Sequence, residues 1–136
     1  MSNIEQTLSI IKPDAVERNL EGEIKEMFKN KGFQILKEKK IQIEKSEAEK
    51  FYKVHETKPF YNDLCDYLSS GPIVVLVLQK ESAVKENREL MGATNPKDAK
   101  DETIRKKYGI SIDKNSVHGS DSVYNAKLEI DFFFKD

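Results

Sequence analysis

Residues 115–122, which read NSVHGSDS, gather several groups that could do chemistry. An imidazole stands there among small and polar residues, at the predicted junction between an extended segment and the last helix. Gly119 lets the backbone turn tightly and lets another group approach, and the amides that open the helix favour an anion. His118 could therefore be a general base, a metal ligand or a nucleophile. Alternatively, it is a surface histidine on a helix-capping turn.

Two further residues are within reach of His118. Ser120 follows two positions later and could orient a partner. Glu129 lies about two helical turns beyond the predicted corner, so the helix could return its carboxylate to the imidazole. Metal ligation is disfavoured, because a zinc site needs three or four His or Cys ligands and the whole chain has two His and one Cys.

Arginine is scarce in a chain rich in lysine. Only Arg18, Arg88 and Arg105 are arginines among 23 basic residues, and arginine suits sites where a rigid fork grips an oxyanion. Arg88 precedes the Thr94 hydroxyl by six residues. With Lys12 at the end of the first predicted strand, Arg88 and Arg105 could clamp a polyphosphate. The alternatives are ordinary surface ion pairs and an exposed lysine; for Arg18 a structural or surface role is expected.

Other reactive or aromatic residues have less specific settings. Phe60 follows Pro59 in a predicted loop and could stack on a flat ligand, although core packing is the common role of phenylalanine. His55 and Cys65 are expected to be structural, with Cys65 buried. Neither a Walker loop nor a G-x-G-x-x-G motif occurs, so an ATP site here would need another architecture.

The first half of the chain alternates between strand and helix patterns. Residues 7–11 predict a strand that ends before Pro13, and residues 24–28 have helical spacing before a stop at Gly32. Residues 33–43 predict a half-exposed strand. One face of that strand would carry Phe33, Ile35, Ile41 and Ile43. Residues 46–49, SEAE, predict a capping box that opens a helix at Ser46.

The second half continues the alternation. A short helix carries Leu64 and Leu68, and the unbroken apolar run 73–78 predicts a strand buried on both faces. Residues 82–91 predict a helix closed by Gly92, and a short helix surrounds Arg105. The remaining patterns are an extended or irregular piece at 110–117, a corner at 118–119 and a last helix capped by Ser120 or Asp121.

These elements predict an α+β sandwich. The simplest fit is a ferredoxin-like βαββαβ order, with a four-stranded antiparallel sheet and helices packed on one face. The 136 residues suffice for one domain, which we expect to span residues 1–136.

Composition excludes several functional classes. The net charge is −1 and the sequence pI is about 6.2, so no broad field favours nucleic acid or an anionic membrane. The longest apolar run has only six residues, too few to span a bilayer, and no secretory signal opens the chain. A single cysteine fits a reducing compartment. A cytoplasmic protein without membrane or nucleic-acid partners is expected.

Taken together, these segments closely resemble nucleoside diphosphate kinases. The resemblance runs from residue 7 to residue 134. It is carried by the segments 11–15 (IKPDA), 55–60 (HETKPF), 70–72 (SGP), 87–96 (NRELMGATNP) and 115–122. The last of these is the most specific, because a histidine in that polar run follows all the other segments in order.

The resemblance implies a catalytic centre and a reaction. Ping-pong phosphoryl transfer would pass the γ-phosphoryl group of a nucleoside triphosphate through His118 to a nucleoside diphosphate such as GDP. Ser120 and Glu129 match residues that orient and assist the imidazole, and Lys12 matches a catalytic residue that also contacts the nucleotide. Which ring nitrogen attacks is left open.

The resemblance also implies the nucleotide contacts. The phosphates would contact Lys12, Tyr52, Arg88, Thr94 and Arg105. Lys12 and Asn115 would also reach the sugar hydroxyls, while Phe60 stacks on the base and Ile112 forms the opposite apolar wall. Stacking without contacts to base edges implies broad base tolerance. Mg²⁺ would ride on the nucleotide phosphates without a protein cage.

Family members assemble into hexamers or tetramers built from dimers, and this sequence does not decide between them. It departs from the family at Lys80, at Asp101-Glu102, where Pro-Gly is usual, and at Tyr108-Gly109. Two other functions remain open: a nucleotide-sensing domain without chemistry, and a scaffolding protein that keeps only the fold. The joint presence of all the matched positions favours the enzyme.

Overall fold

A computed structural model describes residues 4–112 and 114–134 of the chain. Its sheet has four antiparallel strands in the order β2-β3-β1-β4. The strands are β1 (Ile4–Ile11), β2 (Gln34–Ile41), β3 (Ile73–Glu81) and β4 (Val117–Gly119). This order confirms the predicted α+β, ferredoxin-like βαββαβ sheet, and it places β4 at an edge, beside β1.

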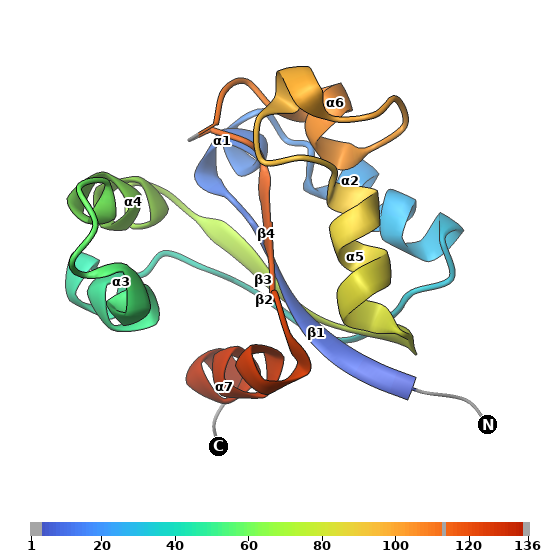
Figure 1. Ribbon diagram of the computed structural model, residues 1–136, viewed down its shortest axis with the longest axis horizontal. Coiled ribbons are helices and arrows are strands. Elements are labelled where there is room, and N and C mark those ends of the chain that lie inside the picture. The colour runs from blue at the N-terminus through green and yellow to red at the C-terminus, as the bar shows by residue number, and fades with distance from the viewer. Residues whose placement is uncertain (1–3, 113, 135–136) are drawn as a thin grey trace.

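Helices connect the strands and close the chain (Figure 1). Between β1 and β2 lie α1 (Pro13–Glu17) and α2 (Glu21–Asn30), and between β2 and β3 lie α3 (Lys45–Phe51), the 3₁₀ segment η1 (Lys53–His55) and α4 (Tyr61–Leu68). Between β3 and β4 lie α5 (Ala83–Met91), η2 (Pro96–Asp98) and α6 (Ile104–Tyr108), and the last helix is α7 (Val123–Phe134).

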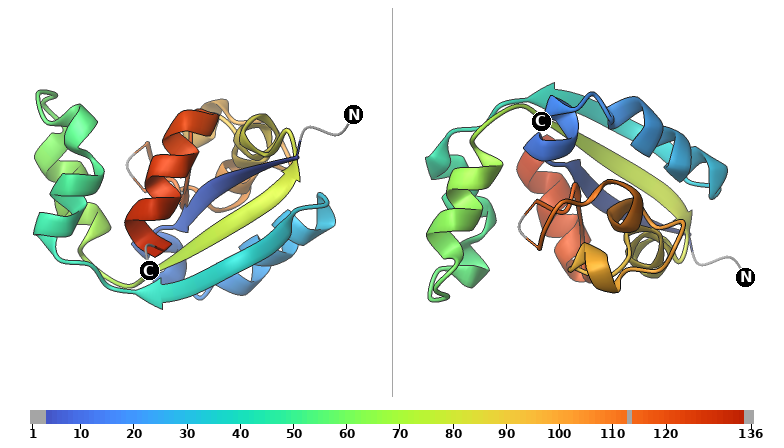
Figure 2. Two further views of the ribbon diagram at one scale, coloured as in Figure 1. Left: turned by 90° about the horizontal axis from the view of Figure 1, so that it is seen from below. Right: turned by 90° about the horizontal axis from the view of Figure 1, so that it is seen from above.

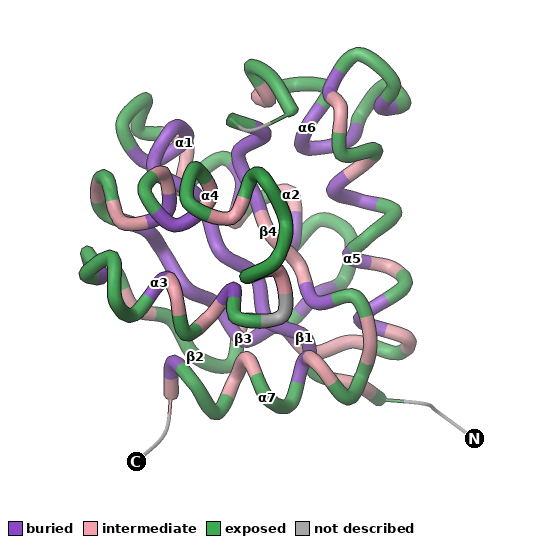
Figure 3. Tube along the Cα trace, turned by 60° about the vertical axis from the view of Figure 1, so that its left-hand side comes forward, coloured by how far each residue is buried: buried purple, intermediate pink, exposed green. Residues whose placement is uncertain are grey.

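Helices cover both faces of the sheet, so the prediction of helices on one face is wrong. Figures 1 and 2 show α3, α4 and α7 on one side and α2, α5 and α6 on the other. Alternate residues of β3 belong to two separate cores: Val74 and Leu76 pack with Phe28 of α2, whereas Ile73 and Val75 pack with residues of α3, α4 and α7. The apolar run 73–78 had already required cover on both faces, and Figure 3 shows the central strands as buried.

The expected single apolar face of β2 is also wrong. The pairing of β2 with β3 shifts register between Ile35 and Lys37, which marks a β-bulge or irregularity. Phe33 packs in the core under α2, whereas Ile43 packs in the core under α3. Because side chains alternate between faces, one additional residue exchanges the two faces of the strand beyond it.

Three predicted boundaries need correction. The reciprocal cap of α3 is formed by Glu44 and Glu47, and the helix begins at Lys45 rather than being opened by Ser46. At the start of α7 the Ser122 hydroxyl accepts the Asn125 N–H at 3.0 Å, so neither Ser120 nor Asp121 is the cap. Residues 118–119 belong to β4 and form no corner.

The structural expectations for Cys65 and Arg18 are confirmed. Cys65 is buried, and burial raises the pKa of its thiol. Arg18 has a structural role, because it bonds the Tyr108 carbonyl at 2.6 Å and the Asp14 carboxylate at 3.2 Å. Within the described residues, no helix is both long and apolar enough to cross a bilayer.

Candidate functional site: a histidine–carboxylate pair beside a buried arginine

His118 is held on β4, where the strand pairs with β1. Its Cα lies opposite Ile10 in the antiparallel register. Gly119 allows the close approach of α5, because a Cβ there would lie 2.5 Å from Asn87 Nδ2 and 2.8 Å from the Met91 side chain. The backbone next to the imidazole is therefore fixed by the sheet on one side and by α5 on the other.

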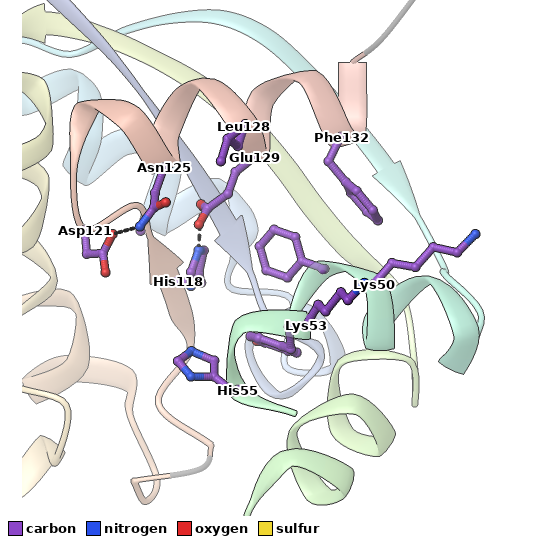
Figure 4. Close-up of a pocket in the computed structure, with 12 residues that line it drawn as sticks. Lys50, Lys53, His55, His118, Asp121, Asn125, Leu128, Glu129 and Phe132 are labelled. Carbon is purple, nitrogen blue, oxygen red and sulfur yellow. Dashed lines mark hydrogen bonds and ion pairs between the residues drawn. The ribbon is translucent and has the colours of Figure 1, made fainter. Parts of the chain in front are cut away.

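The structure brings the predicted catalytic carboxylate and hydroxyl to His118. His118 Nε2 lies 3.0 Å from Glu129 Oε1 (Figure 4). Ser120 Oγ donates to the same oxygen at 2.8 Å. The Ser120 hydroxyl also accepts the Leu8 N–H at 3.3 Å. The edge of the Phe51 ring packs against the imidazole, with the ring centroids 5.3 Å apart. An ionised Glu129 therefore favours the tautomer with its proton on Nε2.

Lys12 and Asn115 form a second group at the end of β1. Lys12 is 7% exposed, and its Nζ donates to Asn115 Oδ1 at 2.9 Å. The Asn115 amide donates in turn to the Thr94 carbonyl at 3.1 Å, whereas the Thr94 side chain belongs to an exposed residue. Three predicted nucleotide contacts are thus linked although they come from three separate segments.

Arg105 is a buried cation held by backbone. It is 9% exposed, and its guanidinium donates to the Gly92 carbonyl at 3.0 Å and to the Val117 carbonyl at 2.9 Å. Burial and then the charge of Arg88 lower the pKa of Arg105 to about 10, so the group remains protonated at neutral pH. Arg88 itself is exposed on α5. Arg105 contacts Val117, the residue before His118, and Arg88 is near enough to repel its charge, so the two cations form a setting that favours an anion.

A cavity of about 290 Å³ opens between α3 and α7, with His118 in its wall (Figure 4). Tyr52 and Glu129 also line the cavity, but Lys12, Arg88 and Arg105 do not. Tyr52 is buried, and burial raises the pKa of its phenol, so it presents a neutral hydroxyl. Of the predicted set, the cavity wall thus joins only His118, Tyr52 and Glu129.

The two proposed base-stacking residues lie at the surface. Phe60 is 43% exposed just before α4, and Ile112 is 54% exposed in the loop before β4. Core packing therefore does not account for Phe60. Both side chains are therefore accessible to a ligand.

His55, which the sequence analysis expected to be structural, lies near His118. It lines the same cavity as His118, and its ring lies 6.2 Å from the Tyr52 ring and 6.0 Å from the Phe60 ring. Burial and then the Lys58 charge lower the pKa of His55. The scarcity argument applied to arginine would have singled it out, because the chain has only two histidines.

Asp121 was expected only as a possible helix cap, and it too lies at the site. It lines the cavity and accepts a 2.6 Å hydrogen bond from Asn125, and that bond is the main reason its pKa is lowered.

Within residues 4–112 and 114–134, no three His, Cys, Asp or Glu side chains are grouped so that they could hold a metal ion.

Comparison with known proteins agrees with this geometry. Residues 5–136 match the family model for nucleoside diphosphate kinase. A nucleoside diphosphate kinase of Nitratiruptor sp. is 58% identical over 131 residues, covering 96% of each chain, and one of Campylobacter jejuni is 57% identical over 132 residues, covering 97% of this chain and 96% of the relative.

Solved structures extend the similarity to three dimensions. The Aquifex aeolicus nucleoside diphosphate kinase is 40% identical with a TM-score of 0.95, over 97% of this chain and 96% of that one. The Encephalitozoon cuniculi enzyme is 36% identical with a TM-score of 0.93, over 97% and 90% of the two chains. With the family model spanning nearly all of its length, the chain belongs to the nucleoside diphosphate kinase family and is a phosphotransferase.

Proposed function

We propose that this enzyme transfers the γ-phosphoryl group of a nucleoside triphosphate to a nucleoside diphosphate through a phosphohistidine at His118. The observation that carries the proposal is the hydrogen-bonded group of His118, Glu129 and Ser120 beside the buried Arg105. Because Nε2 faces Glu129, Nδ1 keeps its lone pair and is the attacking atom.

The reaction has two matched steps. In the first, a bond forms between Nδ1 and the γ-phosphorus while the bond from that phosphorus to the bridging oxygen breaks, and a nucleoside diphosphate leaves. In the second, a terminal β-phosphate oxygen of the acceptor attacks the phosphohistidine and frees Nδ1. Glu129 stabilises the positive charge that the imidazole carries between the steps, and Ser120 holds Glu129 in place.

The cationic side chains supply the other requirement of phosphoryl transfer, which is positioning and charge neutralisation. Arg88, Arg105 and Lys12 would bind phosphate oxygens, with the hydroxyls of Tyr52 and Thr94. Supporting this role, the guanidinium of Arg105 is held by two carbonyls and by no carboxylate among its described hydrogen bonds. A bound phosphate would therefore meet a preformed positive charge.

Base and sugar would be held by different residues. Phe60 and Ile112 would enclose the base from two faces, and Lys12 with Asn115 would contact the sugar hydroxyls. The exposure of Phe60 and Ile112 supports a slot that reads no base edges, so we expect broad base tolerance.

Mg²⁺ would enter with the nucleotide. Mg²⁺ prefers oxygen ligands and often relies on substrate phosphates, and the proposed phosphate contacts here are cations and hydroxyls. Glu129 is occupied by His118 and Ser120. The residues therefore fit an ion held by phosphates, where it would neutralise charge on the transferred group.

We further propose one catalytic domain over residues 1–136, located in the cytoplasm and assembled as a homo-hexamer or homo-tetramer. The buried, unpaired Cys65 fits a reducing compartment. β2 ends the sheet and leaves one edge available for pairing. Analytical ultracentrifugation separates the two assemblies by mass.

Labelling with γ-³²P-ATP tests the mechanism. The wild-type enzyme should take up acid-labile label and pass it to GDP, whereas His118→Ala should take up none. Because the chain has only two histidines, His55→Ala assigns the site: label retained on that variant must be on His118. A wild-type enzyme that binds ATP and never takes up label would instead indicate a nucleotide-binding module.

A further inference from the structure

A buried carboxylate outside the proposed catalytic set connects the segments around the site. The Asp14 side chain is 4% exposed and follows Lys12 by two residues. It accepts hydrogen bonds from Tyr67 Oη, from Ser116 Oγ at 3.1 Å and from Arg18 Nη2 at 3.2 Å. These three donors come from three separate parts of the chain, so one carboxylate holds them together.

The first connection runs to the α3–α4 hairpin. Tyr67 lies near the end of α4, donates to Asp14 Oδ1 and accepts the Asp14 N–H at 2.9 Å. Burial and then the bond to Asp14 raise the pKa of Tyr67, so its hydroxyl keeps the proton that it donates. Because α4 begins directly after Phe60, this double contact attaches the helix behind the proposed base-stacking residue to α1.

The second connection runs to the loop that carries Asn115 and Ile112. Ser116 has a left-handed φ of 76°, which is costly for a residue with a side chain. Its carbonyl accepts the Lys12 N–H at 2.8 Å while its hydroxyl donates to Asp14. These two bonds hold Ser116 in this conformation, and they thereby set the direction of the neighbouring Asn115.

The third connection extends to α6. Arg18 bonds Asp14 and also the carbonyl of Tyr108, the last residue of α6. Arg105 belongs to the same short helix. Figure 1 shows α1 between α4 on one side and α6 with its following loop on the other. Two segments form the walls of the proposed nucleotide site: the α3–α4 hairpin with Phe60, and α6 with the loop that carries Ile112 and Asn115. Asp14 is bonded to the first through Tyr67 and to the second through Ser116 and Arg18.

We propose that Asp14 is a positioning residue, which aligns the two walls and directs Asn115 and Lys12 toward the sugar of the nucleotide. The proposal rests on the proposed function, since it assigns Asp14 a role in the same site. Asp14 touches no reacting atom and acts through Tyr67, Ser116 and Arg18. Misaligned walls would weaken the binding of every nucleotide, whereas the loss of the contacts from Asn115 and Lys12 should appear only with substrates whose sugar offers hydroxyls.

Asp14→Asn tests the proposal with matched substrates. For a ribonucleoside triphosphate we expect kcat/KM to fall by about 10- to 100-fold, the scale of a misplacement near 1 Å. For the 2′,3′-dideoxy analogue, which lacks the hydroxyls that Asn115 and Lys12 would contact, we expect a smaller fall, so the preference for the hydroxylated sugar shrinks. Combination with Asn115→Ala should add little further loss, because both changes remove the same contact.

A pair of tyrosines in α4 supplies the control. Tyr67→Phe removes the hydroxyl that holds Asp14, whereas Tyr61→Phe removes a 2.9 Å bond to the Glu49 carbonyl within the same hairpin. Only Tyr67→Phe should lower the sugar preference. Should Asp14→Asn not fold, this pair decides the question alone.

Two results separate the possible failures. If Asp14→Asn or Tyr67→Phe lowers the thermal midpoint while the ratio of kcat/KM for the two sugars stays at the wild-type value, Asp14 serves folding only and the proposal is wrong. Absence of phosphohistidine in the wild-type enzyme would instead overturn the proposed function itself.

Discussion

The proposed nucleophile centre and the exposed nucleotide contacts differ in burial and in hydrogen bonding. The nucleophile centre, His118 with Ser120 and Glu129, is partly or fully buried and joined by hydrogen bonds of 3.0 and 2.8 Å. The exposed nucleotide contacts that we propose are Phe60, Arg88, Thr94 and Ile112. A nucleophile must be oriented before the substrate binds, whereas residues that contact many different nucleotides must remain accessible to them.

Arg105 and Asp14 stand between these two regions. Arg105 is buried like the nucleophile centre, its proposed role is to bind a phosphate, and its Val117 contact lies next to His118. Asp14 holds both walls from behind. Hydrogen bonds within the protein thus fix the groups around the imidazole and the segments that Asp14 contacts, whereas the exposed nucleotide contacts are not held in this way.

The largest expected effect separates orientation of the nucleophile from substrate binding. Glu129→Gln removes the charge that balances the imidazole, so kcat should fall roughly 10²- to 10⁴-fold, as for other orienting carboxylates, with KM little changed. Steady-state kinetics give both values. Asp131→Asn, an exposed carboxylate on the same helix, is the control; a similar loss there would point to a general effect on α7.

Arg105→Lys tests the intermediate position of that residue. A lysine cannot keep both carbonyl bonds and a phosphate contact, so kcat should fall and KM should rise, with kcat/KM lower by about 10²-fold. Arg88→Lys keeps the charge on an exposed side chain and should cost less. Equal losses for the two variants would show that burial of Arg105 adds nothing to catalysis.

Phe60→Ala should affect binding alone. Loss of base stacking, worth about 1–3 kcal/mol, should raise KM roughly 10- to 100-fold for purine and pyrimidine nucleotides alike, with kcat nearly constant. Tyr124→Ala, which removes an aromatic residue that is 74% exposed on α7, should leave KM unchanged. A selective loss for one base would contradict a slot that ignores base edges.

The smallest expected effect concerns the free energy of unfolding and the loop before α6. Glu102 has a φ of 71°, at the position where the resemblance expects glycine. Glu102→Gly should relieve about 1–2 kcal/mol of left-handed strain and lose about 0.4–1 kcal/mol to the freer unfolded chain. The net gain of about 1 kcal/mol corresponds to roughly 2–4 °C in Tm. Calorimetry measures it, and Glu102→Ala, which keeps the strain, should show no gain.

Much of the architecture could be predicted from local patterns. The run 73–78 identified the central strand because a strand covered on both faces is apolar throughout, and Gly92 ended α5 as expected. Prediction from the sequence failed where one additional residue in a strand changes the direction of all the side chains beyond it. The register shift in β2 exchanged the faces of Phe33 and Ile43, and no local signal marked it.

The amino-acid sequence by itself determined the family and singled out His118 as the proposed nucleophile, because the order and spacing of the 115–122 run and the scarce arginines leave few alternatives. Only the tertiary structure decided which groups meet. Asp14 bonds Tyr67, which lies 53 residues further along the chain, and Ser116, which lies 102 residues further. His55 likewise shares a cavity with His118. Such contacts depend on how the helices pack across the sheet, and periodicity within one segment carries no information about that.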